Sequence, residues 1–216
     1  FTLLTKLKET SVLATYYGID NESNTKVIIK TLRRKAIPPS LELRLIEEAN
    51  HIQKLKHFLP EAPLQVGTDT EWLYAVLPFV EGQSLRKKLG GGSIEWTFVL
   101  DIGIRLLESL CNAHDNGIIH GDIKPENIIL NESADKNSVT LIDFGLSWRE
   151  DIGLSPTESL IGTLNYLSPE QGGLTQNRVD QRSDLYSVGV VMYECLTGKA
   201  LFESNTIGEL LRHHLT

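Results

Sequence analysis

Four polar residues near the middle of the chain have the types and spacing that phosphoryl transfer from a nucleotide requires. The segment HGDIKPENIIL contains Asp122, Lys124 and Asn127, and Asp143 opens a DFG tripeptide 21 residues after Asp122. The reaction needs a carboxylate beside the attacking hydroxyl, a cation for the transferred phosphoryl group, and oxygen ligands for magnesium. Asp122, Lys124 and the pair Asn127 with Asp143 supply these functions in that order.

A solvated loop is the plainer interpretation of the same residues. Asp122 and Lys124 would then form a surface salt bridge, and Asp143 would be an ordinary turn residue before a glycine. Each fragment alone fits both interpretations. The two fragments together, at this spacing, favour the catalytic one.

The order of predicted elements places these residues between two lobes. β-type runs occupy residues 1–7, 12–18, 25–32 and 71–80, and a helix capped by Ser40 is predicted over residues 40–57. A second helix over 94–117 ends at Gly117, two β-rich runs follow, and helical spacing returns from about residue 180. This order predicts an α+β protein with lobes 1–78 and 79–216, and ligands are favoured between lobes.

The composition limits the classes of partner. The chain has 216 residues, 21 Lys plus Arg against 28 Asp plus Glu, and a formal net charge of −7. This balance argues against a nucleic acid or an anionic membrane as partner, although local cations and a metal ion can still hold a phosphate group. No apolar run approaches the ~20 residues that cross a bilayer, so no membrane insertion is expected.

Two cysteines, Cys111 and Cys195, are too few for a disulfide framework or a cysteine-based zinc site. Both lie in apolar stretches with helical spacing, so both are predicted to be small core residues. This usage indicates a reducing, cytoplasmic compartment. The chain begins without an initiator Met, and we expect it to be part of a longer protein.

The HGDIKPEN and DFG segments resemble the catalytic and magnesium loops of eukaryotic-like (Hanks-type) serine/threonine protein kinases. The resemblance extends over essentially the whole chain. VIIK, ending at Lys30, resembles the strand-3 lysine segment, and Glu48 stands where the family has its helix-C glutamate. LPFVEG resembles the hinge and makes Leu77 the residue at the back of the adenine pocket. GTLNYLSPEQ resembles the substrate-docking segment, and SDLYSVG resembles the start of a central helix whose Asp184 braces the catalytic loop.

The resemblance implies a bilobal protein-kinase-like fold with a β-rich N-terminal lobe and a mainly helical C-terminal lobe that lacks its last helices. It implies ATP and Mg²⁺, a protein substrate with Ser or Thr hydroxyls, and further domains of the same polypeptide. The sequence resembles bacterial members of the family. It is similar to kinase domains at the N-terminus of long signalling proteins that also contain an ATPase module and a sensor histidine kinase. Lys30, paired with Glu48, is expected to anchor the α- and β-phosphates. The other expected nucleotide-binding positions are Leu7, Thr15, Ile28, Leu77, Phe79 and Ile129.

Several of these positions have simpler explanations. A lysine in a strand is usually a surface residue, and helix surfaces are rich in glutamate. Glu47 and Glu48 differ by ~100° around the helix axis, and only Glu48 shares the side of Ile52, so Glu48 is predicted to face inward. His114 and His120 have no partner at metal-ligand spacing, and His120 is predicted to pack under Phe144.

The family pattern is broken at two motifs. The positions that resemble the three glycines of the nucleotide loop hold Lys8, Thr10 and Leu13. A non-glycine residue in the left-handed region costs ~1–2 kcal/mol, so we expect weak nucleotide cover by this hairpin. HGD replaces HRD, which removes the arginine that would bind a phosphate of the activation loop. Obligatory switching is therefore not expected from phosphorylation of Ser155, Thr157 or Ser159.

Two other functions stay open on the sequence alone. The degenerate loop is compatible with a pseudokinase that serves as a scaffold or regulatory input domain, although the retained polar positions argue against it. A small-molecule kinase of the aminoglycoside or choline type also uses HGD with a later Asn. Lys124 and the docking segment favour a protein substrate, and Lys124 with Thr163 favours Ser or Thr as the acceptor. The main prediction is ATP- and Mg-dependent transfer to Ser or Thr hydroxyls of a protein.

Overall fold

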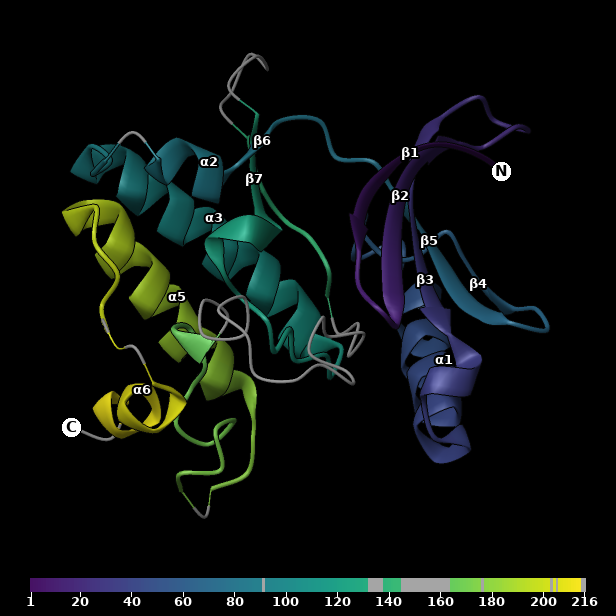
Figure 1. The fold of residues 1–216 in the computed structure, drawn as a ribbon. Helices are drawn as coiled ribbons and strands as arrows, with labels where there is room; N and C mark the ends of the chain where they lie inside the picture. Colours follow the sequence, from purple (N-terminus) through teal and green to yellow (C-terminus); the bar gives the residue numbers. More distant parts are fainter. Residues whose placement is uncertain are drawn as a thin grey trace. The chain divides into compact units, whose positions relative to one another are not determined.

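A computed structural model describes residues 1–90, 92–131, 138–144, 164–175, 177–202, 204 and 206–214. The described residues form two compact units (Figure 1). The first is Phe1–Val80, and the second comprises Glu81–Phe144 with the described residues from 164 to 214. One unit is built on an antiparallel sheet and the other mainly on helices, so the chain has the α+β class that the sequence predicts. The lobe boundary at residues 78 and 79 stays a prediction.

The first unit is a five-stranded antiparallel sheet in the order β1-β2-β3-β5-β4. All four predicted runs form strands, with ends within two residues of the expected ones. The sequence pattern missed β4, a short QVGT segment that has no apolar alternation. The strands are β1 (Thr2–Glu9), β2 (Leu13–Ile19), β3 (Lys26–Arg33), β4 (Gln65–Thr68) and β5 (Trp72–Pro78).

One long helix, α1 (Pro39–Lys54), packs on this sheet after the short 3-10 turn η1 (Arg34–Ala36). Its buried residues Leu45 and Ala49 share a hydrophobic cluster with Leu73 and Ala75 of β5. The predicted cap at Ser40 is wrong, because Pro38 is the N-cap and a proline occupies the first helical turn. Proline suits that position because the missing N–H has no helical partner there.

The second unit combines helices with a three-stranded sheet in the order β6-β7-β8. The region predicted as helix 94–117 forms a helix whose C-cap is Asn116, and Gly117 follows it at φ 74°. The sequence pattern missed β6 and α2, which are too short to show a period. The elements are β6 (Gln83–Ser84), α2 (Leu85–Leu89), α3 (Trp96–Asp115), η2 (Pro125–Asn127), β7 (Ile128–Asn131), β8 (Ser138–Leu141), α5 (Gln181–Thr197) and α6 (Ile207–His213).

Helices α3 and α5 run antiparallel and form the core of this unit. The Ile94 amide, just before α3, donates to the Cys195 carbonyl near the end of α5 at 2.7 Å. At the other end, Gln181 Nε2 donates to the carbonyl of His114 at 3.1 Å. The start of α5 is therefore held beside the end of α3. The catalytic-loop segment follows directly after α3. None of the helices that the structure describes is long and apolar enough to span a membrane.

The two cysteines have different environments. Cys195 is buried, and burial raises the pKa of its thiol to about 12. Cys111 is exposed, so its predicted place in the core is wrong. The buried face of α3 passes through Leu110 and Ala113. Because successive helical residues are separated by ~100°, Cys111 points away from that face.

His214, directly after α6, fastens this helix to the rest of the second unit. Its Nε2 lies 3.1 Å from the Leu164 carbonyl, and its Nδ1 lies 2.7 Å from the Tyr186 hydroxyl. A carbonyl only accepts hydrogen bonds, so Nε2 carries the proton and Nδ1 accepts from Tyr186. Burial lowers the pKa of His214 below its ordinary value of 6.5, and the neighbouring His213 acts in the same direction.

We predict that His214 makes folding stability depend on mildly acidic pH. Its pKa is lower in the folded state than in the unfolded state, so its neutral contacts stabilise the fold above pH 6.5 and are lost as pH falls through the folded value. Thermal unfolding at pH ~7.5 and ~5.5 measures this effect. The melting temperature of wild type should fall more between these two conditions than that of His214→Gln. Equal falls would contradict the assignment.

Candidate active site

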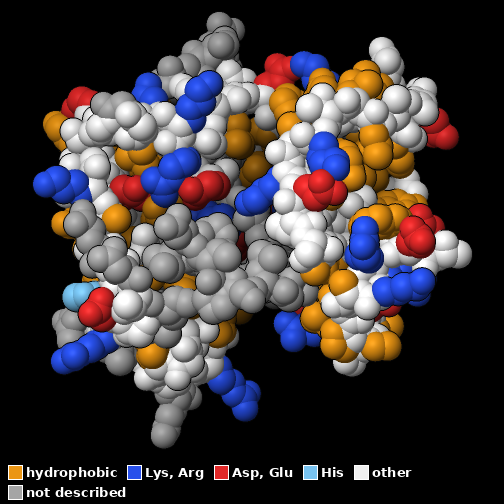
Figure 2. Space-filling view, viewed as in Figure 1, with side chains coloured by type: hydrophobic (Ala, Val, Ile, Leu, Met, Phe, Trp, Pro, Cys, Tyr) orange, Lys and Arg blue, Asp and Glu red, His pale blue; other side chains and the backbone are white. Residues whose placement is uncertain are grey.

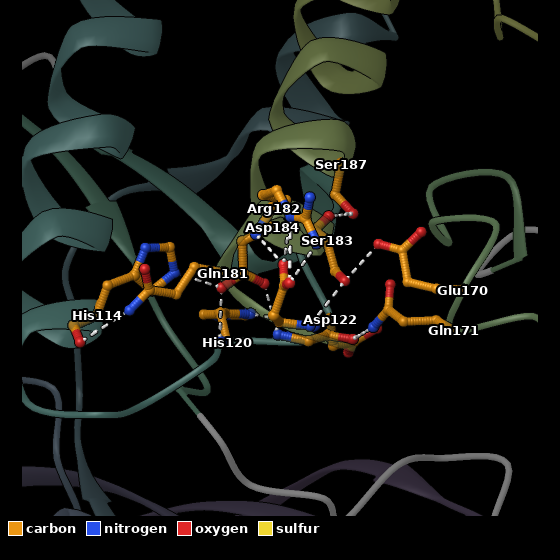
Figure 3. Close-up of polar contacts among 12 residues, drawn as sticks. His114, His120, Asp122, Glu170, Gln171, Gln181, Arg182, Ser183, Asp184 and Ser187 are labelled. Carbon is orange, nitrogen blue, oxygen red and sulfur yellow. Dashed lines mark hydrogen bonds and ion pairs between the residues drawn. The ribbon is translucent and has the colours of Figure 1, made fainter. Parts of the chain in front are cut away.

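The catalytic-loop segment is anchored at its start by Asp184, in the first turn of α5 (Figure 3). Asp184 Oδ2 accepts from the His120 amide and lies 2.8 Å from His114 Nε2, and its Oδ1 accepts from the Gly121 amide at 2.8 Å. The side chain is 1% exposed. The first turn of a helix also favours a negative charge. The predicted bracing role of Asp184 is confirmed.

Gly121 makes a sharp change of direction between His120 and Asp122. Its φ is +75°, a region in which glycine is not strained. Gln171 Nε2 donates to the Gly121 carbonyl at 2.8 Å, and Glu170 accepts from the Ser183 hydroxyl of α5 at 2.5 Å. The loop is thus tied both to α5 and to the segment that follows residue 164 (Figure 3).

His120 connects the loop to the end of β8. Its Nδ1 accepts from the Asp122 amide at 3.2 Å, and its Nε2 donates to the Ile142 carbonyl at 2.9 Å. The ring packs edge-on against Phe144, with centroids 4.8 Å apart. The predicted packing role of His120 is confirmed. The residues next to Asp122 and Asp143 are therefore fixed relative to each other.

Asp122, Lys124 and Asn127 form one connected group. Lys124 Nζ lies 2.8 Å from Asp122 Oδ2, and Asn127 Nδ2 donates to the Asp122 carbonyl at 2.8 Å and to its Oδ2 at 3.1 Å. The Lys124 residue is only 8% exposed, which contradicts the solvated-loop interpretation. Because the Asn127 amide nitrogen faces Asp122, its amide oxygen is directed elsewhere.

Asp143 adopts a conformation that is uncommon for a residue with a side chain. Its φ is 70°, in the left-handed region, which costs ~1–2 kcal/mol outside glycine. The preceding residue, Ile142, donates its amide to the Asn127 carbonyl at 2.9 Å, so the strained residue is held next to the loop. Such strain persists only where the surrounding structure imposes it, and it is concentrated at functional sites.

Asn127 and Asp143 are suited to magnesium as two oxygen ligands with open positions. Among the described residues, no group of three or more His, Cys, Asp or Glu could hold a metal ion. Magnesium in nucleotide sites is typically held by one or two carboxylates, with phosphate oxygens and water in the remaining positions. The amide oxygen of Asn127 and the carboxylate of Asp143 are oxygen ligands of the kind that this pattern requires.

The sheet of the first unit brings four predicted nucleotide-binding residues onto one face. Thr15 pairs with Lys30 across β2 and β3, and Ile28 pairs with Leu77 across β3 and β5. Directly paired residues point to the same side of a sheet, as do residues two apart in a strand. Helix α1 packs on this face, because Leu45 belongs to the same cluster as Leu77 and Ile28.

Three more of the predicted nucleotide-binding residues have separate surroundings. Leu7 lies at an irregularity in the β1–β2 pairing and is 55% exposed, and hydrophobic side chains are visible at the surface of the first unit (Figure 2). Phe79 packs edge-on against Tyr17, the β2 partner of Ile28, with centroids 5.3 Å apart. Ile129 pairs with Ser84 and Thr140 in the sheet of the second unit.

Glu48 borders the buried face of α1, with its side chain 33% exposed, and forms an ion pair along the helix. Its Oε1 pairs with Arg44 Nε at 2.9 Å, one turn earlier on α1, and its Oε2 is buried without a hydrogen-bond partner. The expected pair with Lys30 stays a prediction. A buried carboxylate oxygen without a partner is costly, so this atom favours a cation on the same face of the sheet.

The β1–β2 hairpin forms without the strain that the missing glycines suggest. Among described non-glycine residues, only Asn24 and Asp143 have positive φ, so Lys8, Thr10 and Leu13 avoid that region. Thr10 Oγ1 accepts from the amides of Val12 and Leu13 at 3.3 and 3.0 Å, and the Thr10 amide donates to the Leu13 carbonyl. The amides that a glycine-rich loop would offer to phosphate are used inside the hairpin instead.

We predict that Thr10→Gly strengthens binding of Mg-ATP. The change releases the amides of Val12 and Leu13 and allows the backbone to approach a phosphate, so the Kd should fall ~3- to 10-fold. Titration calorimetry with a non-hydrolysable ATP analogue measures this affinity. Thr10→Ser keeps the hydroxyl and is the matched control, with wild-type affinity. Unchanged or weaker binding by Thr10→Gly would contradict the role given to Thr10.

Several predicted positions lie outside the described residues. They are Gly145 of the DFG tripeptide, Ser155, Thr157, Ser159 and Thr163.

Three features of the site were not assigned a role from the sequence. Gln171 lies in the SPEQ motif, yet its bond to the loop backbone has no sequence signal. His114 was considered only as a metal ligand, whereas it contacts Asp184. Arg86, on α2, joins a polar cluster beside the loop that is described below.

The arrangement of a carboxylate, a buried lysine and an Asn–Asp pair defines a phosphoryl-transfer type of site on an α+β fold. The chain belongs to the protein kinase family: the family model described as protein kinase domain matches residues 6–215. This match confirms the predicted resemblance and the protein-kinase-like fold. Members of the family use ATP and Mg²⁺.

Curated relatives agree with the family assignment. Serine/threonine-protein kinase pkn2 of Myxococcus xanthus is 32% identical over 219 residues, covering 99% of this chain and 26% of that protein. Pkn3 of the same organism is 33% identical over 202 residues, covering 88% and 36%. PknB of Mycobacterium leprae is 36% identical over 184 residues, covering 82% and 29%. The chain thus spans 26% to 36% of the length of these relatives.

Proposed function

We propose that this chain transfers the γ-phosphoryl group of Mg-ATP to Ser or Thr hydroxyls of a protein. The observation that carries the proposal is the connected group around Asp122. Its carboxylate contacts Lys124 and Asn127 in a loop that is held by Asp184 and by the residue before Asp143. Phosphoryl transfer depends mainly on positioning and charge stabilisation, and this construction serves both.

Each residue of the group has one role in the proposal. Asp122 orients the acceptor hydroxyl and takes its proton, and Lys124 neutralises charge on the transferred phosphoryl group. Asn127 and Asp143 hold magnesium, which supplies charge stabilisation at the phosphate oxygens. The Asp122–Lys124 contact of 2.8 Å keeps both side chains on the same side of the loop.

The nucleotide-binding role extends to residues of the first unit. Lys30 anchors the α- and β-phosphates, and Glu48 is its ionic partner when nucleotide is bound. The partnerless Oε2 of Glu48 supports this pairing, because a buried carboxylate oxygen requires a donor. Thr15, Ile28 and Leu77 contact the nucleotide from the same sheet, and Phe79 contacts it from the position directly after β5. Leu7 and Ile129 complete the set.

A protein acceptor fits this chain better than a small molecule or a non-catalytic role. The relatives named above carry the name serine/threonine-protein kinase. Gln171 and Glu170 of the docking segment contact the loop backbone and α5, respectively, which connects that segment to the catalytic group. The proposal includes further domains in the same polypeptide and a cytoplasmic location, where ATP and reduced thiols such as Cys111 and Cys195 occur together.

Incubation with γ-labelled ATP and Mg²⁺, followed by phosphoamino-acid analysis, tests the proposal. Casein serves as a generic acceptor, and choline and an aminoglycoside serve as small-molecule acceptors. We expect label on Ser and Thr of the chain itself or of casein. Label on the small molecules alone would favour a small-molecule kinase. Absence of any transfer, combined with no thermal shift by ATP with or without Mg²⁺, would favour the scaffold function.

A further inference from the structure

Arg86 is the centre of a polar cluster that the phosphoryl-transfer roles do not use. Its Nε lies 2.8 Å from Glu126 Oε1, and its Nη1 lies 2.6 Å from Glu194 Oε1. Its Nη2 donates to the Tyr166 hydroxyl, which itself donates to Glu194 Oε2. One guanidinium group therefore joins α2 to three segments that are 40, 80 and 108 residues away in the sequence.

The cluster has a buried side and an exposed side. Glu194 and Tyr166 are 6% and 4% exposed, whereas the side chains of Arg86 and Glu126 are 39% and 47% exposed. A buried carboxylate needs a cation and hydrogen-bond donors, and Arg86 with Tyr166 supplies both to Glu194. The planar fork of arginine can bind two carboxylates in fixed directions, which the point charge of lysine cannot do. The buried pair of Arg86 with Glu194 thus fixes the direction of the exposed pair of Arg86 with Glu126, which is called the exposed arm below.

The exposed arm ends inside the catalytic loop. Glu126 lies in η2 between Lys124 and Asn127, and the Asn127 side chain holds Asp122 through two hydrogen bonds. The start of the loop is fixed by Asp184, whereas Glu126, toward its far end, pairs with Arg86. The Arg86–Glu126 pair is the contact that ties this far end to α5 through Glu194.

The same guanidinium also reaches the segment that follows residue 164. Tyr166 lies two residues before Ser168, which binds Gln171, and Gln171 donates to the Gly121 carbonyl. The cluster and this bond connect the segment to both ends of the loop. If the protein substrate binds to this segment, these contacts fix the position of its acceptor hydroxyl relative to Asp122.

We propose that Arg86 is a positioning residue for phosphoryl transfer, which fixes the Glu126 end of the catalytic loop relative to the segment around Tyr166. This inference rests on the proposed kinase activity. Arg86 contacts Glu126, Glu194 and Tyr166, and none of these residues is assigned to bind ATP or magnesium. Its effect should therefore appear in turnover and not in nucleotide affinity, because small displacements of reacting groups lower rates strongly.

The test compares Arg86→Ala and Glu126→Gln with wild type, using casein and γ-labelled ATP. We expect kcat to fall ~10- to 100-fold in Arg86→Ala, with the KM for ATP within about twofold of wild type. Glu126→Gln removes only the exposed arm and leaves the Arg86–Glu194 pair, so it should fold normally and still lose ~3- to 10-fold in kcat. Arg105→Ala removes an exposed pair with Asp101 on α3 and is the matched control, with wild-type kinetics.

Hydrogen exchange provides a readout that does not need activity. The amides of Lys124 and of residues 126–128 should exchange faster in Glu126→Gln than in wild type, while the amides of α1 in the first unit keep their rates. Wild-type kcat in Glu126→Gln, or in a folded Arg86→Ala, would overturn the positioning role. Failure of the proposed function itself would appear differently, as absence of transfer by wild type.

Discussion

Asp122→Asn should lower kcat by ~10²- to 10⁴-fold while leaving the fold and Mg-ATP binding intact. Removal of a general base typically costs this much, and Asp122 is the carboxylate assigned to take the proton from the acceptor hydroxyl. Asparagine keeps the shape of the side chain and one acceptor oxygen for Lys124, which lies 2.8 Å from Asp122 Oδ2. Steady-state transfer of label from γ-labelled ATP to casein measures the effect.

The control for this variant is nucleotide binding. Thermal stabilisation by Mg-ATP should be the same in wild type and Asp122→Asn, because the base is not assigned to the nucleotide or the metal. A kcat within a few-fold of wild type would remove Asp122 from the chemistry. The loop would then be a structural feature and its ion pair with Lys124 a packing contact.

Asp184→Ala should be the most destabilising single substitution among those considered, by ~3–5 kcal/mol. Its carboxylate is 1% exposed and accepts from the amides of His120 and Gly121. Alanine leaves both buried N–H groups without a partner and removes the contact with His114. Such a loss is a large fraction of the ~5–15 kcal/mol by which proteins are stable.

Urea unfolding of wild type and Asp184→Ala measures this loss of folding free energy, which lowers the urea concentration at the midpoint of the variant. The matched control is Asp180→Ala at the N-cap of the same helix, where the carboxylate is exposed and caps α5. A cap substitution typically costs ~0.5–2 kcal/mol. An Asp184→Ala midpoint no lower than that of Asp180→Ala would contradict the bracing role.

The catalytic loop was predictable because its signals are local. Asp122, Lys124 and Asn127 lie within six residues, and their contacts in the structure join neighbours in sequence. Which residues share a face of the sheet with Lys30 could also be predicted, since alternation in a strand fixes which side chains point to the same side. The packing of His120 against Phe144, which lies in a later segment, was predicted from the resemblance to the kinase family.

Features that depend on distant pairings were not predictable from this one sequence. The cluster at Arg86 joins residues separated by 40 to 108 positions, and nothing in LRKKL marks Arg86 as different from the lysines that follow. Helix 94–117 is apolar over much of its surface, so the exposed position of Cys111 required knowledge of its packing partners.

The nucleotide hairpin shows how a local rule can lead to a wrong inference. Missing glycines suggested backbone strain at Lys8, Thr10 and Leu13, because the family geometry was assumed. The hairpin instead uses the Thr10 hydroxyl to satisfy its own amides and stays out of the left-handed region. We still expect this hairpin to bind phosphate weakly. The reason is that its amides are already hydrogen-bonded to Thr10, and not that its backbone is strained.

Transfer of label from γ-labelled ATP by wild type and by Asp143→Asn, measured side by side with Mg²⁺, tests the central claim most directly. Wild type should incorporate phosphate on Ser or Thr. The Asp143→Asn variant should show only background incorporation while its far-ultraviolet circular dichroism and melting transition match wild type. Equal incorporation by the two proteins would contradict the account, because the carboxylate assigned to magnesium would then have no part in the reaction.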